Sequence, residues 1–196
     1  MANNKVLRLG GRATCQPMKD SFPALVREAV MDRPGLSDLP AGYSLRPAEP
    51  ADAAEIARLV DAAYGHYVRR IGMRPGPMRE DYDEVVREGV ATVAEREGSI
   101  AGVIVLRVTD EGFVVDNVAV HPSERGRRLG RALLQFAEAE ARRAGYDSIY
   151  LYTHEQMTEN LDLYSRIGYV EYDRRHQFDP QSQRSFSRVF MRKPVC

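Results

Sequence analysis

Four arginines and two glycines lie within the seven-residue segment RGRRLGR, from Arg125 to Arg131. The segment follows a run of strand-forming residues that Pro122 ends, and it precedes an amphipathic helical pattern. A strand-to-helix turn exposes unpaired backbone N–H groups and the partial positive charge of a helix N-terminus. Phosphate binds well at such a terminus, and glycine lets a backbone approach it closely. The segment therefore predicts a phosphate-binding turn.

The position of the arginines favours this hypothesis over a plain, solvated helix cap, which remains the structural alternative. Arginine in the first helical turn opposes the helix dipole, and a purely structural helix would favour Asp or Glu there. The turn is not a Walker A loop, because no Lys-Ser or Lys-Thr follows the glycines. Its glycine spacing also differs from the G-x-G-x-x-G pattern of dinucleotide-binding turns.

A second pair of polar residues lies nearer the C-terminus, in the segment TENLDLYSRIGY. Asn160 and Tyr164 are four residues apart, so a helix would place both on one face. A tyrosine that packs its ring in the core and an asparagine that caps the helix or faces solvent are the structural alternatives.

Asp116 interrupts the apolar strand pattern FVVDNVAV. Desolvation favours the protonated form of a carboxylate at such a position, which suits a general base. A hydrogen-bonded structural carboxylate is the alternative. Asn117 would point to the opposite face, unless a bulge changes the alternation of side chains. Glu155, just after a later predicted strand, is another candidate base.

Histidine and cysteine show no metal-binding spacing. His154 and Glu155 begin an H-E-x-x-H pattern that lacks its second histidine, and Cys15 and Cys196 lie near opposite ends of the chain. We therefore expect no metal site and no disulfide framework, and we expect a reducing, cytoplasmic location.

The elements that must position these residues follow the order β-α-α-β-β-β-α-β-α-β-β from Tyr43 onward. Adjacent hairpins make most of the sheet antiparallel, whereas the strand–helix–strand passage through residues 113–152 requires a parallel crossover. Helices are predicted over 49–67 and 127–146, and Gly/Pro-rich or polar loops over 69–80 and 174–185. The buried face of the second helix is predicted to consist of Leu129, Leu133, Phe136, Ala137 and Ala141.

The chain has 196 residues, enough for one domain with an extension. We predict a loosely structured extension over 1–42, with one short helix beginning near Ser21, and a domain over 43–196. The 28 basic residues balance the 28 acidic ones, which argues against nucleic-acid or polybasic membrane binding. The longest apolar run, Ile100–Leu106, is far shorter than the ~20 residues that a membrane span needs.

The stretch VAVHPSERGRRLGRALL resembles the acyl-CoA signature of the GNAT superfamily of N-acetyltransferases, and the resemblance extends over roughly Tyr43 to Lys193. The family pattern is Gln or Arg, two residues, Gly or Ala, one residue, and Gly or Ala. Arg125 and Gly130 match it, whereas Arg128 stands where glycine is usual. The resemblance implies an α/β (α+β) fold. Its sheet would be mixed, mostly antiparallel and six- to seven-stranded, with about four flanking helices and a β-bulge in the fourth strand.

The resemblance also implies roles for individual residues. Tyr164 would protonate the leaving thiolate of coenzyme A, and Asn160 would bond an amide of its pantetheine arm. In many relatives, however, the asparagine lies a turn earlier, where this chain has Met157. The strand residues that would bond the pantetheine arm are Val118, Ala119 and Val120. The backbone N–H groups that would hold the pyrophosphate are those of Arg125, Gly126, Arg127, Arg128, Leu129, Gly130 and Arg131.

The implied activity is transfer of an acetyl group from acetyl-CoA to a primary amine of a small molecule or peptide, by direct attack on the thioester. Many relatives use ordered water to take the amine proton, so the role of Asp116 stays open. A non-catalytic acyl-CoA-binding or partner-recognition module on the same fold is the alternative. In the family, loops corresponding to residues 64–82 and 174–185 shape the acceptor pocket, and the resemblance points to a homodimer.

Overall fold

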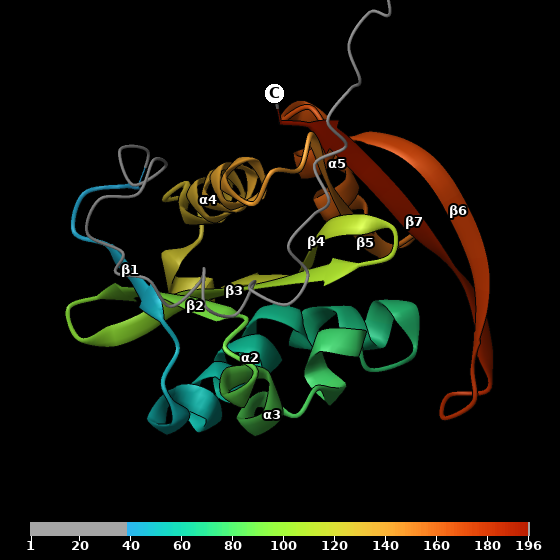
Figure 1. Ribbon diagram of the computed structural model, residues 1–196. Helices are drawn as coiled ribbons and strands as arrows, with labels where there is room; N and C mark the ends of the chain where they lie inside the picture. The colour runs from blue at the N-terminus through green and yellow to red at the C-terminus, as the bar shows by residue number, and fades with distance from the viewer. Residues whose placement is uncertain (1–38, 196) are drawn as a thin grey trace, which may run out of the picture.

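A computed structural model describes residues 39–195 of the chain, in which one seven-stranded sheet has the order β1-β2-β3-β4-β5-β7-β6. The helix α4 covers one face of strands β1 to β4, and α2 and α3 cover the other (Figure 1). The predicted helix near Ser21 and nearly all of the predicted extension over 1–42 lie outside the described residues. The division of the chain at residue 42 therefore stays a prediction.

The order of the elements along the chain is the predicted one, and the mixed sheet with its flanking helices confirms the predicted fold class. The strands are β1 (Ser44–Pro47), β2 (Ala91–Arg96), β3 (Ser99–Thr109), β4 (Gly112–Val120), β5 (Ser148–His154), β6 (Val170–Asp179) and β7 (Arg184–Pro194). The helices are α2 (Ala53–Ile71), α3 (Tyr82–Arg87), α4 (Leu129–Arg143) and α5 (Thr158–Arg166), with the 3-10 turns η4 (Pro50–Asp52), η5 (Gly76–Arg79) and η6 (Pro122–Glu124).

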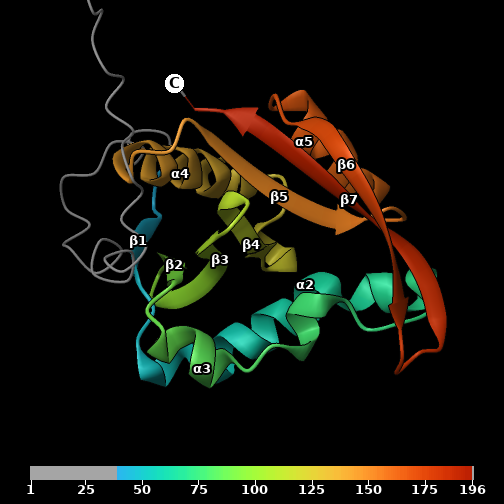
Figure 2. The same ribbon diagram turned by 45° about the vertical axis from the view of Figure 1, so that its right-hand side comes forward.

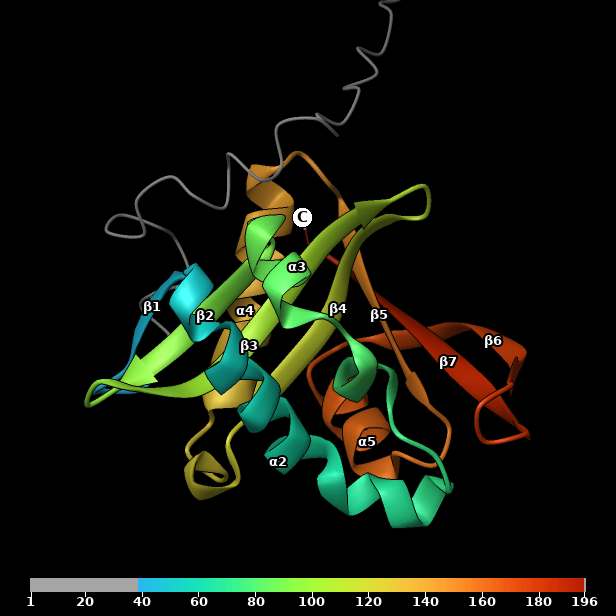
Figure 3. The ribbon, with the colours of Figure 1, turned by 90° about the horizontal axis from the view of Figure 1, so that it is seen from below.

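The sheet opens between β4 and β5, which are its parallel neighbours. Their pairing covers Phe113–Val115 against Ile149–Leu151 and goes no further. Beyond this point β4 continues along β3, while β5 continues along β7, and the two strands separate (Figure 3). Helix α5 lies on the same side of the sheet as α4, with α2 and α3 on the other side (Figure 2).

The predicted bulge lies in β4, where the two strands begin to separate. The register with β3 shifts between Val105 and Leu106, whose partners are Asn117 and Val115. Asp116 is therefore the extra residue of the bulge. A bulge increases the local twist of a strand, so its position favours the separation of β4 from β5.

The apolar pattern of the sequence accounts for the two central layers. Ile100–Leu106, the longest apolar run, forms the middle of β3 and is buried throughout, as expected for a strand covered on both faces. Helix α4 buries the predicted face, which consists of Leu129, Leu133, Phe136, Ala137 and Ala141.

Both predicted loops are shorter than expected. Helix α2 continues to Ile71, because Tyr67 and Ile71 pack with Met73 and Met157, and Gly72 (φ 71°) ends the helix in the left-handed region. Strand β6 continues to Asp179 and β7 begins at Arg184, so the turn is limited to 180–183. The polar residues of β6 have the composition of a loop because this strand lies at the edge of the sheet and only alternate side chains are partly covered.

Gly102 lets α4 approach the sheet closely. A Cβ atom at this position would lie 3.1 Å from the carbonyl oxygen of Ala119, 3.2 Å from Leu133 Cδ1 and 3.3 Å from Leu129 Cδ2. Since Leu129 begins α4, this contact also fixes where the arginine-rich turn lies relative to β4.

Gly102→Ala should lower the free energy of unfolding by about 1–3 kcal/mol, because overpacking forces neighbouring atoms to move. Gly65→Ala is the matched control, because Gly65 is exposed within α2 and an added Cβ would have nothing within 4 Å. The control should raise the free energy of unfolding by about 1 kcal/mol. Urea unfolding measures both, and a Gly102→Ala protein as stable as the wild type would contradict the close packing of α4.

Candidate active site

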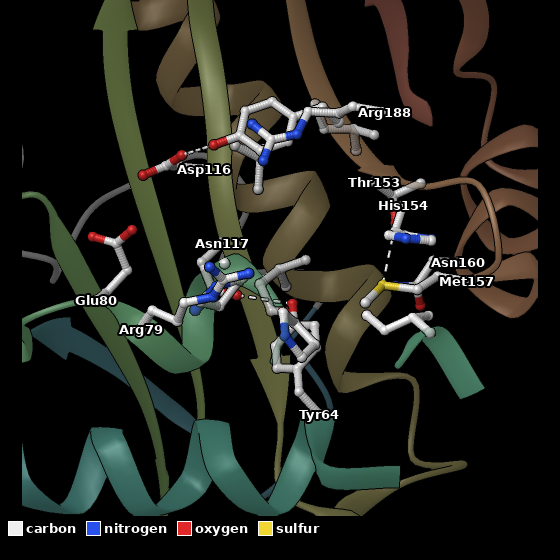
Figure 4. Close-up of a pocket in the computed structure, with 18 of the residues that line it drawn as sticks. Tyr64, Arg79, Glu80, Asp116, Asn117, Thr153, His154, Met157, Asn160 and Arg188 are labelled. Atoms are coloured by element: carbon white, nitrogen blue, oxygen red, sulfur yellow. Dashed lines mark hydrogen bonds between the residues drawn. The ribbon is translucent and has the colours of Figure 1, made fainter. Parts of the chain in front are cut away.

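A cavity of about 670 Å³ lies where β4 and β5 separate. Its walls come from these two strands, from α5, from the segment between α2 and α3, and from the β6–β7 hairpin. Figure 4 shows Asp116 and Asn117 on β4, with His154, Met157 and Asn160 across the gap. The predicted site residues that line this cavity are Asp116, Val118, Asn160 and Tyr164.

The bulge turns two successive side chains, those of Asp116 and Asn117, to the face of the sheet that α2 and α3 cover. The amide of Asn117 donates to the hydroxyl of Tyr82 at 3.1 Å, and the hydroxyl of Tyr64 lies 2.9 Å from Asn117 Oδ1. The same Tyr64 hydroxyl is 3.0 Å from the carbonyl oxygen of Val118. Both Asp116 and Asn117 line the cavity, so the alternation that the sequence left open is broken at the bulge.

Asp116 is held by a cation and a phenol. Arg107 Nε donates to one carboxylate oxygen at 3.0 Å, and the hydroxyl of Tyr152 bonds the other. Arg107 also pairs with Glu88, which directly follows α3. The Asp116 side chain is 22% exposed, so it anchors the bulge and still faces the cavity.

Glu80 is a second carboxylate on the cavity wall, and the sequence did not single it out as a base. Among the described residues, no hydrogen bond or ion pair engages its carboxylate. Burial and the negative charge of Asp116 raise the pKa of Glu80, whereas Arg107 lowers it. No local pattern marks this residue, because only the folding of the α2–α3 segment over the sheet brings it to the cavity.

Tyr164 lies on α5 and is buried, with its ring 6.1 Å from that of Tyr169. It also lines the cavity, so the ring packs in the core and the residue lies at the site as well. Burial, with a smaller contribution from Tyr67, raises the pKa of Tyr164. The hydroxyl therefore keeps its proton at neutral and moderately alkaline pH, as a proton donor must.

Asn160 is half-buried and lies one helical turn before Tyr164. Its Oδ1 is 3.5 Å from the hydroxyl of Tyr67, and its Nδ2 is 3.8 Å from the sulfur of Met157. Both contacts are long, so the amide retains capacity to bond a ligand.

Past the bulge, the edge of β4 that faces β5 pairs with no strand of the described residues. The N–H of His121 donates to the carbonyl oxygen of Ala101 at 2.9 Å. Bonded and non-bonded pairs alternate in an antiparallel ladder, so the N–H of Ala119 points to β3. By the same alternation the N–H groups of Val118 and Val120 point into the gap, where they can bond an extended ligand.

The turn between η6 and α4 is a helix N-terminus with open donors. In the described part of the chain, the N–H groups of residues 126–131 donate to no backbone acceptor, and helical bonding begins with Ala132 N–H to Arg128 O at 3.1 Å. Gly126 (φ 78°) and Arg128 (φ 64°) are both left-handed. The turn thus has the backbone geometry that an anion-binding site requires.

The arginines of this turn differ in their partners. Arg125 donates to the carbonyl oxygen of Ala63 at 3.1 Å, which ties the turn to α2. Arg127 lies 3.4 Å from Glu124. Arg128 and Arg131 are exposed and form no ion pair with a described residue, so their charges are available to a phosphate. The N–H of Arg125 is used within η6, where it donates to Pro122 O at 3.3 Å.

Residues 39–195 were compared with the requirements of a metal site and of a membrane-spanning helix. No three His, Cys, Asp or Glu side chains in this range are arranged to hold a metal ion. No helix in it is both long enough and apolar enough to cross a membrane.

Comparison with known protein families matches residues 54–169 to the acetyltransferase (GNAT) family. This range is more than half of the chain, and it contains the bulge, the open edge of β4, the arginine-rich turn and Tyr164. The chain belongs to the GNAT family.

Two curated relatives and one solved structure illustrate the GNAT match. The chain is 33% identical over 105 residues to a protein of Azospirillum brasilense named IAA acetyltransferase, covering 53% of this chain and 66% of that one. It is 33% identical over 87 residues to a mycothiol acetyltransferase of Thermobispora bispora, covering 41% of this chain and 30% of that one. The chain thus spans less than two thirds of either curated relative.

The structure of yncA from Salmonella typhimurium, solved with its cofactor acetyl-CoA, has the same fold. The TM-score is 0.60 and the sequence identity 24%, with 79% of this chain and 95% of that one covered.

Arg128 occupies the position where the GNAT signature usually has glycine, and its backbone is left-handed (φ 64°, ψ 9°). A residue with a Cβ is disfavoured there by about 1 kcal/mol relative to glycine. Arg128→Gly should therefore be more stable than Arg128→Ala by about that amount, since both lack the guanidinium and differ in backbone freedom. Urea unfolding measures the difference, and equal stabilities would argue against a left-handed residue at the start of α4.

Proposed function

We propose that this GNAT protein is an acetyl-CoA-dependent N-acetyltransferase that acts on a primary amine of a small molecule or peptide. One observation carries the proposal: the open edge of β4 leads directly into the open N-terminus of α4. A strand-like ligand with a phosphate end fits these two sets of open donors, at Val118 and Val120 and at residues 126–131. The Salmonella relative, which was solved with acetyl-CoA, supports the choice of cofactor.

The residues present fit coenzyme A along its length. The N–H groups of Val118 and Val120 suit the carbonyl groups of an extended pantetheine arm, and Asn160 would bond the arm from the other side of the gap. The N–H groups of residues 126–131, together with the charges of Arg128 and Arg131, suit the pyrophosphate. Bound acetyl-CoA would supply the acetyl group as a thioester.

At the thioester, the N–H of Val118 would donate to the carbonyl oxygen, where negative charge develops during attack. The amine nitrogen forms a bond to the acetyl carbon as the carbon–sulfur bond breaks. Tyr164 donates its proton to the departing thiolate, and its raised pKa ensures that the proton is present at neutral pH.

The amine must also lose a proton, and the face that α2 and α3 cover holds two carboxylates for this step. Asp116 lies next to the open strand edge, and Glu80 stands free of hydrogen bonds to the described residues. Their charges are coupled, because Asp116 raises the pKa of Glu80. We assign proton uptake to Glu80 of this acidic pair, while Asp116 orients the amine.

Tyr164→Phe should lower kcat by about 10²-fold while the Kd for acetyl-CoA stays unchanged, because the ring is kept and the donor is lost. The kcat of the wild type should show no loss between pH 8 and about 10, since the raised pKa keeps Tyr164 protonated there. Release of free thiol with a panel of amines gives kcat, and calorimetry gives Kd. Unchanged turnover would remove Tyr164 from the reaction, and a wild type that binds acetyl-CoA without releasing thiol would indicate a non-catalytic module.

Substitutions at Gly130 test the proposed phosphate site, the turn of residues 126–131, without disturbing the fold. A Cβ there would meet Val120 Cγ2 at an ordinary 3.6 Å, so Gly130→Ala should bind acetyl-CoA nearly as the wild type does. Gly130→Glu places a negative charge beside the phosphate site. This charge stabilises the helix N-terminus and repels the phosphate groups of the ligand. Calorimetry should show affinity at least about 10²-fold weaker. If the two variants bind acetyl-CoA with equal affinity, the turn is not the phosphate site.

A further inference from the structure

Two segments that are far apart in the sequence form adjoining walls of the cavity. Arg79, in η5, lies 2.8 Å from Asp179 at the end of β6, which joins the α2–α3 segment to the β6–β7 hairpin. Hydrogen bonds from Ser182 and the charge of Arg79 lower the pKa of Asp179 to about 2, so this ion pair persists at neutral pH. Arg79 is therefore already engaged and is not free to bind a ligand anion.

Arg188 is a half-buried cation on the cavity wall that lacks a counter-charge. Among the described residues, no carboxylate lies within 4.0 Å of its guanidinium, in contrast to Arg79 and Arg107. Its guanidinium carbon instead lies 4.6 Å from the centre of the Tyr152 ring, which holds it in place. A guanidinium that is oriented by an aromatic ring and free of acceptors matches a carboxylate, which it can bind with two parallel hydrogen bonds.

His154 lies beside Arg188 and brings no negative charge to it. The two residues are direct cross-strand partners in the β5–β7 pairing, so their side chains are neighbours on one face. The Nδ1 atom of His154 accepts the N–H of Gln156 at 3.1 Å, which leaves the proton of the neutral ring on Nε2. That Nε2 atom is buried and has no hydrogen-bond partner in the described structure. Burial lowers the pKa of His154, so the ring is neutral at pH 7.

Arg188 lies close to Asp116 of the acidic pair. The ring of Tyr152 stacks on Arg188, and its hydroxyl bonds Asp116. A single tyrosine therefore separates the guanidinium of Arg188 from the carboxylate of Asp116. Figure 4 shows Arg188 and Asp116 on the same side of the cavity, with Glu80 beyond. A ligand with an amine at the acidic pair and a carboxylate at Arg188 can thus have only a few bonds between these groups.

Apolar side chains also line the cavity. Phe178 is 58% exposed, although it is a large aromatic side chain, and it belongs to the cavity wall. Other apolar side chains of the wall include Ile71, Met73 and Phe186.

We propose that Arg188 binds the carboxylate of the acceptor, so that the acceptor is an amino acid with an apolar side chain. The proposal rests on the acetyltransferase function above and names the substrate class of the same site. The carboxylate binds at Arg188, the amine faces Asp116 and Glu80, and the side chain contacts Phe178 and Phe186. Polyamines and simple alkylamines lack the group that Arg188 requires.

Thiol release with matched pairs of acceptors tests the proposal, using L-phenylalanine against phenethylamine and L-methionine against 3-(methylthio)propylamine. The wild type should favour the amino acid of each pair by at least about 10-fold in kcat/KM, the scale of one desolvated charge-assisted contact. Arg188→Gln should bring this ratio close to one, mainly through KM. Arg188→Lys should restore part of it, because it keeps the charge and loses the planar fork.

Arg192→Gln is the matched control. Arg192 lies on the same strand and the same face, stacks on Tyr150 and Tyr172, and does not line the cavity. Its replacement should leave the ratio as in the wild type. Thermal unfolding of all three variants shows whether each is folded at the assay temperature.

Two results would overturn the proposal: a wild type without preference for the carboxylate, or an Arg188→Gln protein that loses activity equally on both members of each pair.

If the wild type releases no thiol with any amine, the acetyltransferase function fails as well. The carboxylate site is then decided by calorimetry of the same pairs on the coenzyme A-saturated protein. Binding of L-phenylalanine that Arg188→Gln weakens supports the site, and equal or undetectable binding of the two members refutes it.

Discussion

The parallel pairing of β4 with β5 stops after Val115 and Leu151, and the whole site depends on this early end. Backbone groups in the middle of a sheet normally find partners within it. Past the bulge, the N–H groups of Val118 and Val120 face a gap instead. The bulge is fixed from both sides, because Arg107 and Tyr152 hold Asp116, and the hydroxyls of two helical tyrosines hold the side chain of Asn117.

The open strand divides the surroundings into two chemical regions. On the side of α4, open backbone donors occur at the strand edge and again at the helix N-terminus, where arginines add positive charge, and together they suit an anionic, extended ligand. On the side of α2 and α3, carboxylates and aromatic rings surround the cavity, and Arg188 lies there with no ion pair to a described carboxylate. Tyr164 reaches the gap from α5. The two substrates of a transfer reaction can therefore approach the same strand from different sides and meet at Val118.

The sequence was sufficient to predict the order of the elements, the strand-to-helix turn at residues 125–131 and the membership of Tyr164 and Asn160 in one helix, because these depend on local patterns. It could not decide how Asp116 and Asn117 are oriented, since that depends on the register of β4 against β3. Glu80 and Arg188 were not recognised for a similar reason. Glu80 reaches the cavity because the α2–α3 segment folds over it, and Arg188 belongs to a strand whose first residues have the composition of a loop.

The most direct test follows the backbone amides of the protein by NMR during titration with acetyl-CoA. Binding along the open edge and the helix N-terminus should slow hydrogen exchange at Val118, Val120 and residues 126–131. Ala119 should change least, because its N–H already bonds to β3. Slowed exchange at Ala119 without an effect at Val118 and Val120, or a turn that does not respond, would contradict the idea that the separation of β4 from β5 creates the cofactor site.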